Sequence, residues 1–111
     1  MGFGQYILDE NNQPIPCEDI LKWGRWFQQN DKLRIVAQDE TPNGRVSTVF
    51  LGLDHRLLRL QGEESPPILW ETMVFGGPLD GEQIRYCSFE AAKAGHVEML
   101  ERVKNGQVER A

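Results

Sequence analysis

Two histidines are the side chains of this chain best suited to proton transfer or metal binding. His55 follows Asp54 directly after an apolar run, and His96 lies on the apolar side of a C-terminal segment with helical spacing. Imidazole groups together with a carboxylate, such as that of Glu71, can exchange protons or bind a divalent metal. No paired spacing of the HExxH or CxxC type joins these residues, so we expect neither a metal site nor a catalytic group among them.

Each of these side chains also has a purely structural interpretation. A histidine on a buried helical face is usually hydrogen-bonded to a carbonyl or carboxylate group. An aspartate at a strand end commonly accepts bonds from nearby backbone amides, and Glu71 could face solvent or pair with an arginine. The residues that we retain as candidates for contact with a ligand or partner are Asp54, His55, Arg56, Glu71, His96 and Trp26.

Cys87 is the side chain best placed to act as a nucleophile, because it precedes a predicted helix and a helix N-terminus favours the thiolate. No base stands at a recognisable spacing from it, and no serine lies in a GxSxG motif. The glycines at 76, 77 and 81 match neither a P-loop nor a GxGxxG fingerprint. We therefore expect no enzyme activity and no cofactor. Cys17 and Cys87 are interpreted as free thiols in a reducing compartment.

The composition limits the class of protein. The chain has 111 residues, of which 40% are hydrophobic, and 17 acidic and 12 basic side chains give a net charge of -5. This length and apolar content predict one domain over residues 1–111. The acidic balance argues against nonspecific binding to nucleic acid or anionic lipid. No apolar run approaches the roughly 20 residues of a membrane span, and no signal-peptide pattern opens the chain, so we expect a cytoplasmic protein.

Hydrophobic spacing divides the chain into two amphipathic helices and four or five strands. The first helix is expected over 17–29, and the second between the N-cap Ser88 and a stop signal at 105–106. Each contains an interior glycine, Gly24 or Gly95, which is unfavourable in a helix and suggests that another backbone approaches closely where the helices touch each other or the sheet. The strands are expected at 5–8, 33–38, 45–53, 68–75 and 83–87.

Short links between successive strands favour an antiparallel meander, and one apolar sheet face can cover two amphipathic helices. We therefore predict an α+β fold, with a four- or five-stranded, mainly antiparallel sheet and two helices packed on one face. The segment 54–67 has no clear assignment, and loops of that length are often functional. The ends of the chain, 1–4 and 106–111, are expected to be flexible.

The first predicted helix gathers several aromatic side chains. Trp23, Trp26 and Phe27 cannot all point in one direction on a helix with 3.6 residues per turn. One tryptophan, for which Trp26 is our candidate, could therefore lie partly exposed beside Arg25, and this pairing is typical of protein–protein hot spots. The alternative is a core helix with an amphipathic tryptophan at its boundary.

Several stretches together carry a family resemblance. They are 46–55 (VSTVFLGLDH), 71–81 (ETMVFGGPLDG), and 85–86 (RY) with 94–96 (AGH), supported by 6–9 (YILD) and 21–27 (LKWGRWF). With these motifs the chain resembles a family of small uncharacterised proteins of tailed phages and prophages, over roughly residues 5–100. The family usually continues Asp54-His55 with a polar and aromatic stretch, where this chain has RLL at 56–58. The resemblance implies a phage or prophage product in the bacterial cytoplasm, and it implies no particular activity.

Three functions remain open at this level. The first is a non-enzymatic accessory module that binds a host or phage protein, for example a host-defence antagonist, and that could also form homo-oligomers. The second is a small-ligand protein that binds or sequesters a nucleotide-like molecule between the 54–67 segment, His96 and the turn at 76–77. The third is a small enzyme that uses His55 and His96, which requires both histidines in one cleft.

Overall fold

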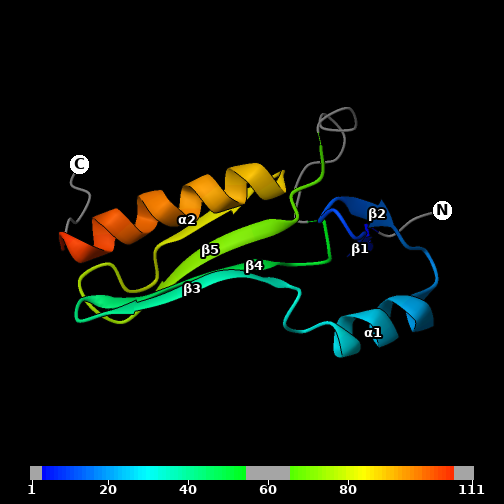
Figure 1. Cartoon of the computed structure of the whole chain (residues 1–111), viewed down its shortest axis with the longest axis horizontal. Helices are drawn as coiled ribbons and strands as arrows, with labels where there is room; N and C mark the ends of the chain where they lie inside the picture. The colour runs from blue at the N-terminus through cyan, green and yellow to red at the C-terminus, as the bar shows by residue number, and fades with distance from the viewer. Residues whose placement is uncertain (1–3, 55–65, 107–111) are drawn as a thin grey trace.

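The computed structural model describes residues 4–54 and 66–106, and Figure 1 shows their arrangement. A four-stranded sheet forms the middle of the molecule, a long helix lies along one of its faces, and a two-stranded sheet and a short helix stand at one end. The elements, in chain order, are β1 (Tyr6–Leu8), β2 (Pro14–Pro16), α1 (Ile20–Gln29), β3 (Ile35–Thr41), β4 (Gly44–Phe50), β5 (Trp70–Phe75), β6 (Gln83–Tyr86) and α2 (Phe89–Lys104).

The strands of the larger sheet follow one another in the order β3-β4-β5-β6, and each neighbouring pair is antiparallel. Tight turns make this meander possible. Gly44 follows the β3–β4 turn with φ 136°, and Gly77 in the β5–β6 connection has φ 77°, values that glycine adopts readily. The register places Thr48 of β4 opposite Thr72 of β5. The predicted α+β class and its four-stranded antiparallel sheet are confirmed.

α2 covers the face of the sheet to which alternate residues of β4 point. Val46, Thr48 and Phe50 are only 0%, 0% and 1% exposed, because residues two apart in a strand share a face. Ser88 begins the helix by accepting a hydrogen bond from the amide of Ala91 at 3.0 Å. The predicted packing of a helix on the sheet is therefore confirmed for α2. The buried hydrophobic side chains form two clusters. Their members are Leu8, Val46, Phe50, Leu69, Trp70, Val74, Leu79, Ala92, Met99 and Val103.

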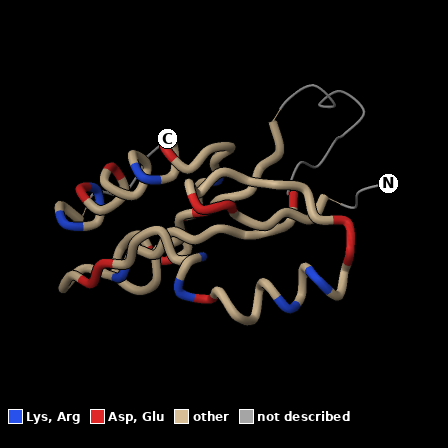
Figure 2. Tube along the Cα trace, turned by 45° about the vertical axis from the view of Figure 1, so that its right-hand side comes forward, with Lys and Arg blue, Asp and Glu red and all other residues tan. Residues whose placement is uncertain are grey.

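α1 lies beyond the end of the larger sheet and not on its face. At the level of the backbone it contacts β1 and, within the ranges described, none of the strands β3 to β6, and Figures 1 and 2 both show it apart from the sheet. The helix begins at Ile20, later than the predicted start, because the carboxylate of Asp19 accepts hydrogen bonds from the amides of Leu21 and Lys22. Of the two helices that we predicted to pack on one face of the sheet, only α2 does so.

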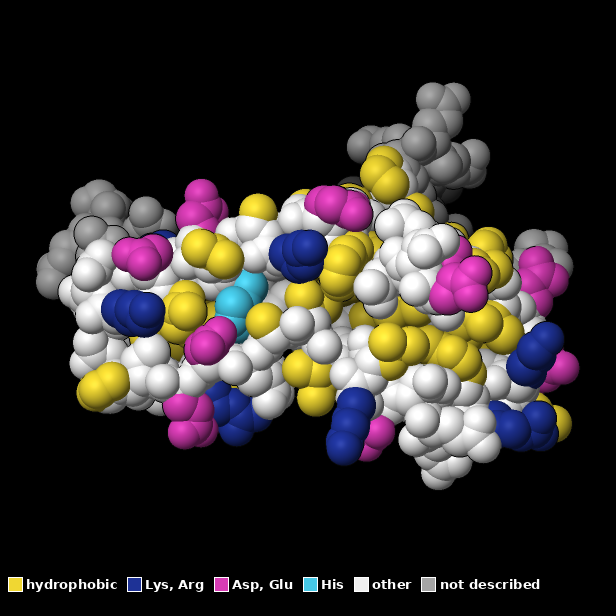
Figure 3. All heavy atoms as spheres, viewed as in Figure 1, with side chains coloured by type: hydrophobic (Ala, Val, Ile, Leu, Met, Phe, Trp, Pro, Cys, Tyr) yellow, Lys and Arg dark blue, Asp and Glu magenta, His cyan; other side chains and the backbone are white. Residues whose placement is uncertain are grey.

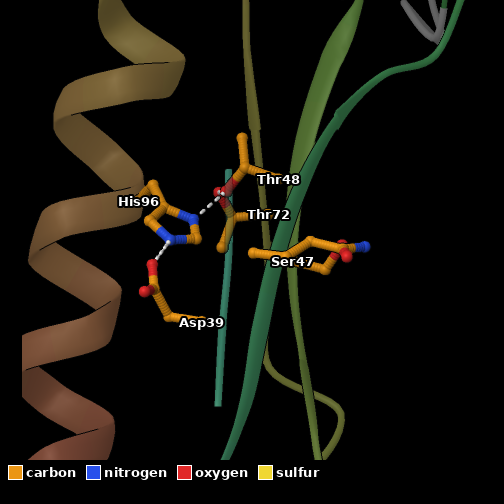
Figure 4. Close-up of polar contacts among 6 residues, drawn as sticks. Asp39, Ser47, Thr48, Thr72 and His96 are labelled. Atoms are coloured by element: carbon orange, nitrogen blue, oxygen red, sulfur yellow. Dashed lines mark hydrogen bonds and ion pairs between the residues drawn. The ribbon is translucent and has the colours of Figure 1, made fainter. Parts of the chain in front are cut away.

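The face of the sheet opposite α2 carries no helix of the described ranges. Figure 4 shows Ser47 pointing to this side, away from the side that carries His96. Its hydroxyl accepts a hydrogen bond from Nε2 of Gln38 at 3.0 Å. Phe75, which follows the buried Val74 along β5, is 48% exposed. This open face therefore mixes polar and apolar side chains.

The two helix glycines differ in their surroundings. A Cβ at Gly95 would lie 2.2 Å from the hydroxyl oxygen of Tyr86, so α2 meets the sheet there, but through a side chain of β6 and not through the backbone that was predicted. A Cβ at Gly24 would meet no atom within 4 Å, so the same prediction is wrong for α1. The predicted flexible ends fall mostly outside the described residues, which begin at Gly4 and end at Gly106.

Candidate functional site

His96 joins α2 to three strands through a buried chain of hydrogen bonds, drawn in Figure 4. Its Nδ1 atom lies 2.7 Å from Oγ1 of Thr48, and Oγ1 of Thr48 lies 2.5 Å from Oγ1 of Thr72. On the other side of the ring, Nε2 lies 2.8 Å from Oδ2 of Asp39. The chain of contacts therefore runs from β3 through α2 to β4 and β5.

These hydrogen bonds are complete in either charge state of the imidazole. In the neutral ring with a proton on Nε2, this N–H group donates a hydrogen bond to Asp39, Thr48 donates to Nδ1 and Thr72 donates to Thr48. In the imidazolium, Nδ1 donates to Thr48, whose hydroxyl rotates and donates to Thr72. Both ring nitrogens are thus engaged within the protein, which leaves neither one for a ligand.

The order carboxylate, imidazole, hydroxyl is also the order of a catalytic triad, but its burial separates it from one. Thr48 and Thr72 are 0% exposed and His96 is 3% exposed, so a substrate has no route to the hydroxyl groups. Only the Asp39 end reaches solvent, with 49% of its side chain exposed. The arrangement therefore serves the packing of α2, and it fits the structural interpretation of His96.

Asp54 and Glu71, the other polar candidates within the described residues, make their hydrogen bonds away from His96. Asp54 accepts a hydrogen bond from the amide of Ile68 at 3.0 Å, as expected for an aspartate at a strand end. Glu71 accepts a hydrogen bond from Nε of Arg85 at 3.0 Å and another from Gln83. Because Glu71 is adjacent to Thr72 in β5, its side chain lies on the opposite face of the sheet from His96.

Two of the predicted candidates, His55 and Arg56, lie outside the described residues. Across the two described ranges, no group of three or more His, Cys, Asp or Glu side chains could hold a metal ion. His96, one of the three parts predicted to line a ligand pocket, is enclosed between α2 and the sheet.

The two tryptophans of α1 are both half-buried, but they face different surroundings. Trp26 packs against the buried core and meets the ring of Phe50 edge-on, with 6.1 Å between centroids. Trp23 instead lines an open groove on α1. Partial exposure, predicted for one of the two tryptophans, is therefore found at both positions, and Trp23 is the one that lines the groove.

The groove on α1 has a volume of about 650 Å³. The first turn of α1 is strongly apolar yet open to solvent, since Ile20 is 59% exposed and Leu21 is 74% exposed. Figure 3 shows hydrophobic side chains gathered over the end of the molecule that carries α1, β1 and β2. The residues that line the groove are Ile20, Leu21, Trp23, Gly24, Arg25, Phe27, Gln28 and Arg34.

The aromatic wall of the groove is held by specific contacts. The indole Nε1 of Trp23 donates to the carbonyl oxygens of Tyr6 at 3.0 Å and Gly52 at 3.3 Å. Its ring stacks on Phe27, with centroids 4.8 Å apart. The guanidinium of Arg34 lies 3.7 Å from the centroid of the Phe27 ring, and its Nε donates to the Phe27 carbonyl at 3.3 Å. These contacts hold the wall in one arrangement.

The electrostatic character of the groove differs from that of the whole chain. Arg25 and Arg34 line it, and among the residues that the structure describes no carboxylate does, although the chain carries a net charge of -5. Figure 2 shows basic and no acidic positions along α1 itself. The groove is therefore a local cationic and apolar surface on an acidic protein.

Gly24 is an unfavourable residue for a helix interior, and the structure shows that it lines the groove. A glycine in a helix interior costs about 1 kcal/mol relative to alanine. No contact within 4 Å requires it. The exposed apolar pair Ile20–Leu21 was the second available signal, since a strongly amphipathic helix normally buries its apolar residues, and α1 fully buries none of them.

No family model, curated protein or solved structure matches this chain. No helix of the described ranges is long and apolar enough to cross a membrane.

Proposed function

We propose that this protein is a non-catalytic binding module that holds a segment of another protein in the α1 groove. The observation that carries the proposal is the exposed apolar first turn of α1, formed by Ile20 and Leu21. It borders a groove of about 650 Å³, a size typical of sites that bury a side chain or a small ligand. The wall contributes Trp23, and Arg25 and Arg34 add the charged groups that binding hot spots favour.

The energetics of α1 support a partner for this surface. An apolar side chain that leaves water contributes roughly 25 cal/mol for each Å² buried. Leu21 is 74% exposed, so most of its side chain contributes no burial free energy to the folded chain. A partner that covers the first turn of α1 would gain it.

The buried cluster around His96 supports a binding role over a catalytic one. A general base must be within reach of the proton that it abstracts from a substrate, whereas His96 is enclosed by its own hydrogen bonds. In this proposal the cluster fastens α2 to the sheet, and α1 makes the functional contact.

The biological setting of the proposal follows from the sequence resemblance. We place the protein among phage or prophage accessory proteins that act in the bacterial cytoplasm on a host or phage protein. Antagonism of a host defence is one form of that activity. Binding of a small nucleotide-like ligand is the alternative, and it would give no protein cross-link from the α1 groove in the experiment below.

The test is site-specific photo-cross-linking in bacterial cells. A photoreactive residue replaces Leu21 in the groove, and a matched control replaces Val97, which is 62% exposed on α2. We expect a protein partner to be cross-linked from position 21 and not from position 97. With that partner purified, Leu21→Ser should weaken binding about tenfold or more while Val97→Ser leaves it unchanged. Equal cross-linking from both positions, or none from position 21, would contradict the proposal.

A further inference from the structure

We propose that the α1 groove recognises an acidic and apolar peptide segment, which seats one large apolar side chain over Gly24 and presents a carboxylate to Arg25 and Arg34. This inference rests on the proposed function and names the chemistry of the partner. Two independent observations lead to it, the environment of Gly24 and the state of the two arginines.

Gly24 lies at the centre of the groove. Its neighbours three and four positions away on the helix surface are adjacent to it in space, and all of them line the groove; they are Ile20, Leu21, Phe27 and Gln28. A Cβ at Gly24 would meet nothing within 4 Å. The space above Gly24 is therefore open to a side chain of a partner.

Two other glycines, Gly95 and Gly52, contrast with Gly24 because side chains of this chain pack against them. At Gly95 an added Cβ would meet Tyr86 at 2.2 Å, and at Gly52 it would meet Phe27 at 2.5 Å. Those glycines make room for other parts of this chain. Gly24 makes room for nothing in the described chain, although glycine disfavours a helix, so we infer that it makes room for a partner.

The two arginines fix the charge of the partner. Within the described ranges neither Arg25 nor Arg34 has an ion pair. Arg34 is already oriented by Phe27, through its ring and its carbonyl group, so little side-chain entropy is lost when it binds. A planar guanidinium suits the two oxygens of a carboxylate.

The same observations favour a peptide over a nucleic acid. A polyanion would be repelled by a chain of net charge -5. A peptide can combine a single carboxylate with a large apolar side chain, and it matches both the two arginines and the apolar wall of Trp23 and Phe27.

The experiment uses two soluble peptide libraries against the immobilised full-length chain. Each peptide has one central Leu, Phe or Trp, flanked by Asp or Glu in the first library and by Lys in the second. We expect the acidic library to be enriched about tenfold or more over the basic one. Affinities of the selected peptides are then measured by NMR titration, following the indole signal of Trp23.

The decisive variant is Gly24→Ala. It should raise the melting temperature by about 4 °C, because alanine favours the helix, and it should weaken peptide binding about tenfold because it fills the groove. Arg34→Gln and Arg25→Gln should each weaken binding of the acidic peptides about fivefold. The matched control is Gln29→Ala, an exposed α1 position outside the groove, which should leave binding unchanged.

The possible outcomes separate this inference from the proposed function. Unchanged binding by Gly24→Ala, or equal enrichment of the two libraries, overturns the inference even if a partner is cross-linked from position 21. Self-association in sedimentation that is lost in Gly24→Ala would overturn it in favour of a second copy of the chain. Selective binding of single-stranded DNA to the groove would overturn it in favour of a nucleic acid. Failure of cross-linking at position 21 contradicts the proposed function itself.

Discussion

Thr48 and Thr72 face each other across β4 and β5, and their hydroxyl oxygens lie 2.5 Å apart inside the core. Neither side chain is exposed to solvent. Thr48 also contacts Nδ1 of His96 at 2.7 Å, so a single hydroxyl links two strands to the helix that covers them.

Thr48→Val is expected to destabilise the protein by about 1–3 kcal/mol, because it leaves Nδ1 of His96 buried without its partner. The volume of the side chain hardly changes, so a loss of packing contributes little. Urea denaturation measures the free energy of unfolding. Ser47→Ala, in the adjacent position on the opposite face, is the control and should cost less. Equal losses at both positions would show that the hydroxyl of Thr48 has no special role.

Thr48→Val and Thr72→Val should not be additive. The first substitution already removes the hydroxyl with which Thr72 interacts, so the second has less left to remove. We expect a coupling free energy of about 0.5–3 kcal/mol in a double-mutant cycle. Additive losses, measured by the same denaturation, would mean that the two hydroxyl groups do not depend on each other.

Gly95→Ala is expected to destabilise the protein by about 1–3 kcal/mol, because the new methyl group would collide with Tyr86. The same substitution at Gly24 is the matched comparison, since that Cβ would meet open space. Thermal unfolding of the two variants should therefore show shifts of opposite sign. A loss of stability in both would indicate that Gly24 supports the fold after all.

Tyr86→Phe is expected to leave the stability unchanged or to raise it by up to about 1 kcal/mol. The hydroxyl oxygen of Tyr86 is buried and has no hydrogen-bond partner in the described structure, and an unpaired buried polar group is unfavourable. Calorimetry gives the change in melting temperature. A marked loss of stability would show that this hydroxyl group forms a hydrogen bond in solution.

Much of the fold follows from local pattern in the sequence. The glycine turns that follow β3 and β5, and the short links between successive strands, predict the antiparallel meander. The N-cap Ser88 and the apolar face that contains His96 predict α2. The structural interpretation of His96 is also confirmed, since a histidine on a buried face requires polar partners.

The partners of His96 could not be predicted, because they depend on strand register. Asp39 lies 57 residues and Thr48 lies 48 residues away from it in sequence, and no local spacing relates them. The register of β4 and β5, which places Thr48 opposite Thr72, determines which hydroxyl groups lie beside His96.

The position of α1 is the other feature that local pattern could not give. Its apolar stripe shows that the helix has a side to cover, but not whether the sheet, another element or a partner covers it. Trp23 and Trp26 lie close together on that stripe. Which of them lines the groove depends on where the helix meets Phe50 and Gly52. The sequence marks Gly24 as unusual for a helix, but only the structure shows that the space beside it is open.

The carbonyl oxygen of Gly52 accepts hydrogen bonds from two donors, the amide of Tyr6 at 2.8 Å and the indole of Trp23 at 3.3 Å. The groove wall and the start of β1 are thus fastened to the same atom. Elements that share their hydrogen bonds tend to open together in local unfolding. A ligand that occupies the groove should therefore slow hydrogen exchange at the Tyr6 amide as well as at the Trp23 indole, so the N-terminal strand would report on binding without touching the ligand.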